Sequence, residues 1–199
     1  MSKKATKESL IINAAQSLFL KYGYSKTSLD DIAKEAHIGK GTIYYYFESK
    51  ENLFFRIAEN QIELIKEKLG ETFKQTDIAD WEEFFIKAVL KPMAVLLELD
   101  TVIFDMIHIL KTSYTNKLEE LEEVWLETIK NYIVRVIDVC VAANDFEVDA
   151  QELSIAILDI LFYESEGQIH DIEYIKETII RTNASAELIL RYLYRGISK

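Results

Sequence analysis

Three consecutive tyrosines, Tyr44–Tyr46, closely follow the tripeptide Lys40-Gly41-Thr42. Successive residues on an α-helix point about 100° apart, so three neighbours cannot all enter one core. Tyrosine hydroxyl groups can donate to phosphate oxygens, and the rings can contact the methyl groups of thymine. A lysine at the amino end of a helix, where backbone N–H groups are free, also favours phosphate. These residue types at this spacing predict a helix that binds DNA.

The apolar residues of the same segment define the buried side of this helix, which we expect over residues 40–47. Ile43 and Phe47 are four positions apart and share one face, so that face must pack on the core. Tyr45 lies nearly opposite, and the tyrosines on either side of it flank the buried face. Gly41 lets the amino end of the helix approach a base edge closely. The tyrosines are therefore predicted to face outward.

Two helices are expected before this one. Apolar residues recur at intervals of three and four from about residue 5 to 22, and again from Leu29 in a short segment. Gly23 follows the first helix at the position where a left-handed cap is expected. Ser28 and Asp31, three residues apart, resemble a capping box at the start of the second helix.

A helix-turn-helix is predicted over about residues 28–47, because two short helices are joined there by a turn of about three residues. A fourth helix is expected to open at Ser49-Lys50-Glu51 and to extend to about Phe73. Residues 1–60 are thus expected to form a DNA-binding domain, followed by a second domain over 61–199.

Three segments closely resemble the N-terminal domain of TetR-type (tetracycline-repressor-like, TetR/AcrR) regulators: TSLDDIA (27–33), GKGTIYYYF (39–47) and SKENL (49–53). The resemblance covers about residues 5–60. It implies an all-helical dimer that usually represses transcription and releases DNA when a small molecule binds its C-terminal domain. By position, the DNA contacts that the resemblance implies are Thr27, Ser28 and Lys50 on phosphates, Lys40, Gly41 and Thr42 at the groove edge, and Tyr44, Tyr45 and Tyr46.

Two positions depart from the family pattern. His37 stands where the family usually has a turn glycine, and histidine is among the few other residues that tolerate a positive φ. Gly39 stands where a serine or threonine cap is common, so one capping hydroxyl is lost.

The composition predicts an all-α protein. Hydrophobic residues make up 49% of the 199 positions. One proline and six glycines are few turn-forming residues for a many-stranded sheet. The single cysteine, Cys140, indicates a reducing compartment, and no stretch reaches the length of a membrane span, so a cytoplasmic protein is expected. The three histidines and Cys140 lie far apart, so we expect no metal and no cofactor.

The net charge of −11 is unevenly distributed. Residues 1–60 hold nine Lys and Arg against seven Asp and Glu, a net of +2, and the rest of the chain holds 14 against 27, a net of −13. An acidic body repels DNA, so any DNA contact must come from the N-terminal part.

The C-terminal part is expected to be a dimerising helical bundle. Helices are predicted around Pro92, which should kink its helix, and over about 101–111 and 116–143. Residues 154–163 are apolar nearly all round, so a second copy is expected to cover them together with 184–197. The prediction is a two-fold homodimer whose paired helices form a four-helix bundle and which presents two recognition helices to a palindromic double-stranded operator.

A small hydrophobic effector of unknown identity is the expected ligand of this bundle. Asp105 and Asp159 are candidates to orient it, and aromatic side chains could line its pocket. These aromatic residues are Phe84, Phe85, Phe104, Trp125, Tyr132 and Phe162. Two alternatives stay open: a DNA-binding adaptor whose bundle docks a protein partner and binds no small molecule, and an enzyme that uses the bundle cavity. The enzyme is disfavoured because no acid, base or metal cluster is visible.

Overall fold

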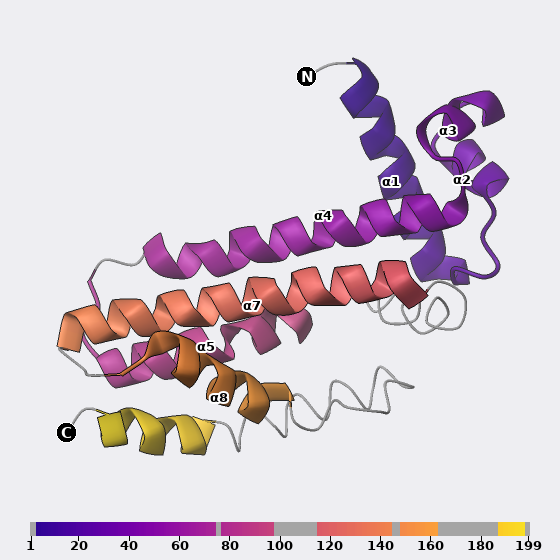
Figure 1. Ribbon diagram of the computed structural model, residues 1–199. Helices are drawn as coiled ribbons and strands as arrows, with labels where there is room; N and C mark the ends of the chain where they lie inside the picture. Colours follow the sequence, from indigo (N-terminus) through magenta and orange to yellow (C-terminus); the bar gives the residue numbers. More distant parts are fainter. Residues whose placement is uncertain (1–2, 75–76, 98–114, 145–147, 163–186, 198–199) are drawn as a thin grey trace. The chain divides into compact units, whose positions relative to one another are not determined.

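The protein is all-helical throughout the part of the chain that the computed structural model describes, which is residues 3–74, 77–97, 115–144, 148–162 and 187–197 (Figure 1). The helices are α1 (Lys3–Tyr22), α2 (Leu29–Glu35), α3 (Lys40–Tyr46), α4 (Lys50–Gly70), the 3-10 helix η1 (Glu71–Lys74), α5 (Trp81–Leu97), α7 (Thr115–Asn144), α8 (Ala150–Phe162) and a C-terminal helix over 187–197. None of these described helices is long and apolar enough to cross a membrane. The helix predicted over 101–111 lies outside the described residues.

The chain divides into two compact units. In the described chain, unit 1 comprises residues 3–63 and 115–121, and unit 2 comprises 64–97, 122–162 and 187–197 without the gaps noted above. Each unit has its own hydrophobic core.

The core of unit 1 is built from one face of each of α1 to α4. Phe19, Ile32, Ile43 and Phe54 are at most 2% exposed and belong to one cluster. The apolar stripe predicted for the second helix is confirmed, since its members are all buried: Leu29, Ile32, Ala33 and Ala36. Burial of these faces fixes the orientation of the two short helices, which would not be stable alone.

The core of unit 2 contains a proline within α5. Pro92 has no backbone N–H, so the carbonyl of Ala88, four residues earlier, loses its partner in the helix. The buried hydroxyl of Tyr132 in α7 donates to that carbonyl at 2.9 Å. A side chain from another helix therefore satisfies the acceptor that the proline leaves open.

The C-terminal helix over 187–197 packs one face on unit 2 and leaves another exposed. Leu190 and Tyr194 are buried, whereas Leu188, Ile189 and Tyr192 are 44–70% exposed. The neighbours Ile189 and Leu190 therefore lie on different faces of this helix.

Candidate nucleic-acid interface

The amino end of α2 is fixed by a reciprocal cap. The backbone N–H of Asp31 donates to Oγ of Ser28 at 3.2 Å, and the N–H of Ser28 donates to Oδ2 of Asp31 at 3.1 Å. Hydrogen bonds from the Ser28 hydroxyl and from the Ser28 backbone N–H to the carboxylate hold the pKa of Asp31 below its ordinary value. The predicted capping box is confirmed, and it sets the start of the helix-turn-helix.

The turn between α2 and α3 depends on a residue with positive φ. His37 has a φ of 54°, as its place in the sequence predicted, and its N–H donates to the carbonyl of Lys34 at 3.1 Å. Gly39 then caps α3 with a φ of −70° and no side-chain hydrogen bond. The first backbone N–H groups of α3 are therefore left without a capping side chain, at the positive end of the helix dipole.

The two faces of α3 differ as the sequence predicted. Ile43 and Phe47 are buried at 0% and 5% exposure. Tyr45 is 71% exposed and Tyr44 is 46% exposed. Tyr46 is half-buried, and its ring meets that of Tyr45 edge to face, with centroids 5.2 Å apart. The outward face of α3 is therefore a polar aromatic surface on a helix whose opposite face is buried.

Lys40 is held at the amino end of α3. Its Nζ lies 2.6 Å from Oδ2 of Asp30 in α2 and 5.9 Å from the ring centroid of Tyr44. The hydrogen bond to Asp30 raises the pKa of Lys40 above its ordinary value. This pair joins residues ten positions apart across the turn, so helix periodicity in the sequence does not indicate it.

Two of the proposed phosphate contacts are turned inward. The hydroxyl of Thr27, a residue only 3% exposed, donates to the carbonyl of Gly23 at 2.9 Å. Nζ of Lys50 donates to the carbonyls of Tyr24 and Thr27 at 2.8 and 2.9 Å. Burial lowers the pKa of Lys50. In this structure both side chains support the loop between α1 and α2, which differs from the role expected by position.

Gly41 faces open space. A Cβ built at this position would meet no protein atom within 4 Å, and the residue is exposed. Internal packing therefore does not require glycine here.

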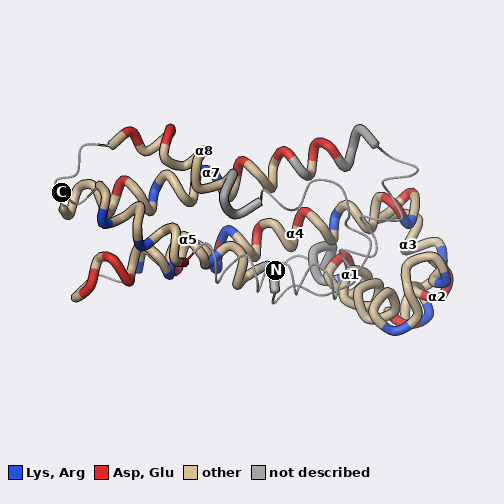
Figure 2. The backbone as a smooth tube through the Cα atoms, turned by 90° about the horizontal axis from the view of Figure 1, so that it is seen from below, with Lys and Arg blue, Asp and Glu red and all other residues tan. Residues whose placement is uncertain are grey.

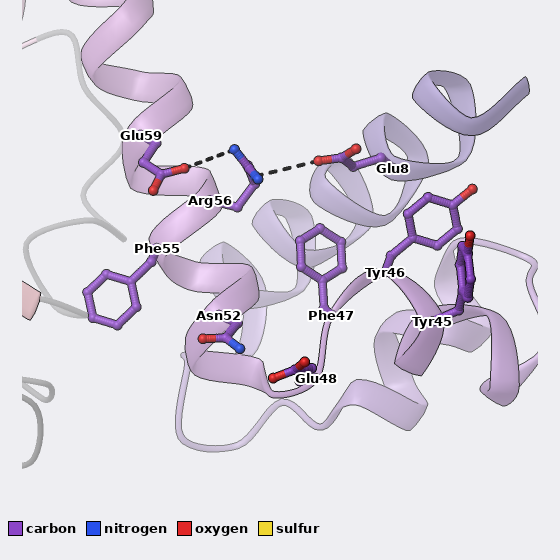
Figure 3. Close-up of a pocket in the computed structure, with 9 residues that line it drawn as sticks. All are labelled: Glu8, Tyr45, Tyr46, Phe47, Glu48, Asn52, Phe55, Arg56 and Glu59. Carbon is purple, nitrogen blue, oxygen red and sulfur yellow. Dashed lines mark hydrogen bonds and ion pairs between the residues drawn. The ribbon is translucent and has the colours of Figure 1, made fainter. Parts of the chain in front are cut away.

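A pocket of about 490 Å³ lies beside the carboxyl end of α3, with lining residues from α1, α3 and α4 (Figure 3). Across it, Arg56 in α4 pairs with Glu8 in α1 at 3.5 Å and with Glu59 at 3.0 Å. The pair with Glu8 connects α1 to α4, and the pair with Glu59 lies within α4.

Basic residues lie on both helices of the motif, beside acidic ones (Figure 2). Lys34 in α2 and Lys40 in α3 are 81% and 65% exposed in their side chains, and each has an aspartate partner. The surface therefore offers cations near the outward face of α3 at a modest local charge.

The aromatic residues suggested for an effector pocket are only partly brought together. Phe84, Phe85 and Tyr132 are buried in the core of unit 2, and Trp125 packs against it. Phe104 lies outside the described residues, as does the side chain of Phe162. Asp105 and the side chain of Asp159 also lie outside them.

The family model for bacterial regulatory proteins of the tetR family matches residues 11–57. The HTH-type transcriptional regulator YhgD of Bacillus subtilis is 40% identical over 68 residues, 34% of this chain and 36% of that protein. QacR of Staphylococcus aureus, also an HTH-type transcriptional regulator, is 34% identical over 79 residues, 38% of this chain and 40% of that protein. The matches thus span little more than a third of either relative.

The fold extends this similarity over most of the chain. A TetR/AcrR-family transcriptional regulator from Thermobifida fusca has a TM-score of 0.65 at 21% identity, and the match covers 92% of this chain and 97% of the other. At this identity the likeness concerns the fold alone.

Proposed function

We propose that this chain, a TetR-type regulator by its N-terminal domain, binds a palindromic DNA operator as a homodimer and represses transcription there. The proposal includes a DNA-binding domain over residues 1–60, a C-terminal domain over 61–199, a cytoplasmic location, and no catalytic activity. A small hydrophobic molecule bound in the C-terminal domain would release the operator.

The outward face of α3 is the observation that carries the proposal. Tyr44 and Tyr45 are exposed on a helix whose opposite side is buried, and Lys40, Gly41 and Thr42 stand at its uncapped amino end. Hydroxyl groups, an ammonium group and free backbone N–H groups are the donors that phosphates and base edges accept. We propose Ser28 and Tyr46 as flanking contacts, and we assign Thr27 and Lys50 to supporting the loop before α2.

Gly41→Ala tests the interface without disturbing the fold. Alanine favours a helix over glycine by about 1 kcal/mol, and the added Cβ meets no protein atom within 4 Å. The variant should therefore be at least as stable as the parent, while its Cβ collides with DNA placed against α3. Weaker operator binding by a more stable protein supports the proposal; unchanged binding contradicts it.

Tyr45→Ala provides a second test, with Tyr22→Ala as the matched control. Both tyrosines lie in unit 1 and are more than half exposed, but Tyr22 ends α1. Loss of Tyr45 should weaken operator binding by about 1–3 kcal/mol, and loss of Tyr22 should change it little. If both variants lose the same operator affinity, the outward face of α3 is not part of the interface.

The operator itself comes from selecting bound sequences out of random duplex DNA, followed by titration at two salt concentrations. A palindromic consensus with a steep salt dependence supports a dimeric, sequence-specific regulator. Salt-steep binding without a consensus contradicts operator recognition, and no binding contradicts the proposal as a whole.

The homodimer would cover the exposed apolar face of the C-terminal helix. Leu188, Ile189 and Tyr192, with Ile155 in α8, are 44–70% exposed although large and apolar. Faces of this kind are usually buried against a partner, and the family acts as dimers. Sedimentation of the parent and of Tyr192→Glu tests this, since a charge within the buried face should yield monomers.

A protein-docking adaptor is the second candidate. Phe84, Phe85 and Tyr132 are packed in the core of unit 2, where an effector would need room. Screening hydrophobic ligands for release of the selected operator separates the two candidates: release by any of them favours the effector-controlled repressor.

A further inference from the structure

Asp30 and Lys40 join the two helices of the helix-turn-helix at the surface proposed to meet DNA. Nζ of Lys40 lies 2.6 Å from Oδ2 of Asp30, and the two side chains are 65% and 42% exposed. The centroid of the Tyr44 ring lies 5.9 Å from the same ammonium group. The Lys40 ammonium group therefore has a carboxylate partner although its side chain is largely in solvent.

The pair leaves Lys40 able to bind an acceptor. An ammonium group carries three N–H donors, and Asp30 takes one of them. The O6 and N7 atoms of guanine are two acceptors on one base edge in the major groove. Lys40 can thus donate to such an edge without leaving Asp30, whereas reaching a phosphate elsewhere would require its stem to swing away and break the pair.

We propose that Asp30 is a specificity-determining residue: by holding Lys40 it weakens binding to DNA of arbitrary sequence and keeps the ammonium group aligned for a guanine edge. The inference rests on the proposed function, because it concerns how the same surface distinguishes an operator from other DNA. Asp30 acts through Lys40 and is not itself expected to touch DNA.

Charge and geometry act together here. Binding to arbitrary DNA depends on cations that neutralise phosphates and release counterions, and a paired lysine contributes little to that. Removing the carboxylate would free Lys40 for the nearest phosphate. The affinity for DNA would then rise for every sequence, while the alignment of Lys40 that favours an operator is lost.

Asp30→Asn measures this directly. The amide keeps the size of the side chain and removes its charge. We expect affinity for random-sequence duplex to rise by about three- to tenfold, with a salt slope steeper by about one. Operator affinity should stay the same or fall, so the ratio between the two affinities decreases.

Glu35→Gln is the matched control. Glu35 lies at the other end of α2, is exposed, and its replacement removes the same charge. If this variant raises random-sequence affinity as much as Asp30→Asn does, the effect is one of net charge and the inference is overturned. Repeating both changes with Lys40→Gln in place gives a second test, because Asp30→Asn should then do no more than Glu35→Gln.

The outcomes separate this inference from the proposed function. A parent protein that binds no duplex overturns both. A parent that binds its selected operator, while Asp30→Asn and Glu35→Gln behave alike, overturns the inference only. If the parent binds DNA without any consensus, operator recognition fails, and a selective gain in Asp30→Asn still supports restraint of Lys40. Thermal melting of each variant verifies that the helix-turn-helix is folded.

Discussion

Tyr132→Phe should destabilise unit 2, and Pro92 should determine by how much. The Tyr132 hydroxyl donates to the Ala88 carbonyl at 2.9 Å. The same hydroxyl oxygen lies 3.0 Å from Oγ1 of Thr72, and that Oγ1 accepts a hydrogen bond from Nζ of Lys91 at 2.9 Å. Removing it leaves a buried carbonyl without its donor, which costs about 1–3 kcal/mol. The free energy of unfolding should fall by that amount. Urea titration followed by tryptophan fluorescence measures it, because both tryptophans lie in unit 2.

Pro92→Ala supplies the decisive comparison. Alanine restores a backbone N–H four residues after Ala88, so that the carbonyl has a donor within α5 again. In this background Tyr132→Phe should cost about 0.5–1.5 kcal/mol, the worth of an ordinary hydrogen bond such as the one to Thr72. If Tyr132→Phe costs the same with and without Pro92, the Tyr132 hydroxyl does not replace the donor that the proline lacks.

Three further predictions concern single groups. Gly39→Ser should raise the free energy of unfolding of unit 1 by a few tenths of a kcal/mol, because Gly39 has an ordinary φ and room for a Cβ, and a serine hydroxyl can cap α3. A thermal melt measures the change, and a lower melting temperature would contradict this. Burial raises the pKa of Tyr132 to about 12 from 10.0. The stability that its neutral hydroxyl gives the folded protein is therefore complete below pH 10 and is lost between pH 10 and 12. The free energy of unfolding of the Tyr132→Phe variant should lack that part of the pH dependence. Cys140 is 2% exposed, and burial raises its pKa to about 12. A thiol reagent at pH 8 should therefore modify Cys140 only as fast as the protein unfolds. Rapid modification of the folded protein would show that the thiol is accessible.

Local chemistry is what the sequence predicted best. The Ser28 cap, the positive φ of His37 and the two faces of α3 each depend on residues within a few positions of one another. Helix periodicity and cap geometry act over that distance, so a single sequence contains the information.

Contacts between distant residues were missed for the same reason. Lys50 donates to a carbonyl 26 positions away, Lys40 pairs with Asp30 ten positions away, and Tyr132 donates to Ala88, 44 positions away. A lysine exposed to solvent cannot be told from a structural lysine in a sequence, because the backbone carbonyls that the structural lysine binds come from residues far away in the chain.

The separation of faces on α3 has a consequence for how such a protein can evolve. Ile43 is fully buried and a truncation there would cost several kcal/mol, about 2–5 for a buried aliphatic residue. Tyr45 is 71% exposed, and changes at such positions usually alter stability by less than about 0.5 kcal/mol. Mutations can therefore accumulate on the outward side of the helix without passing through unfolded intermediates, so descendants of this chain could acquire new binding preferences while inheriting the same scaffold.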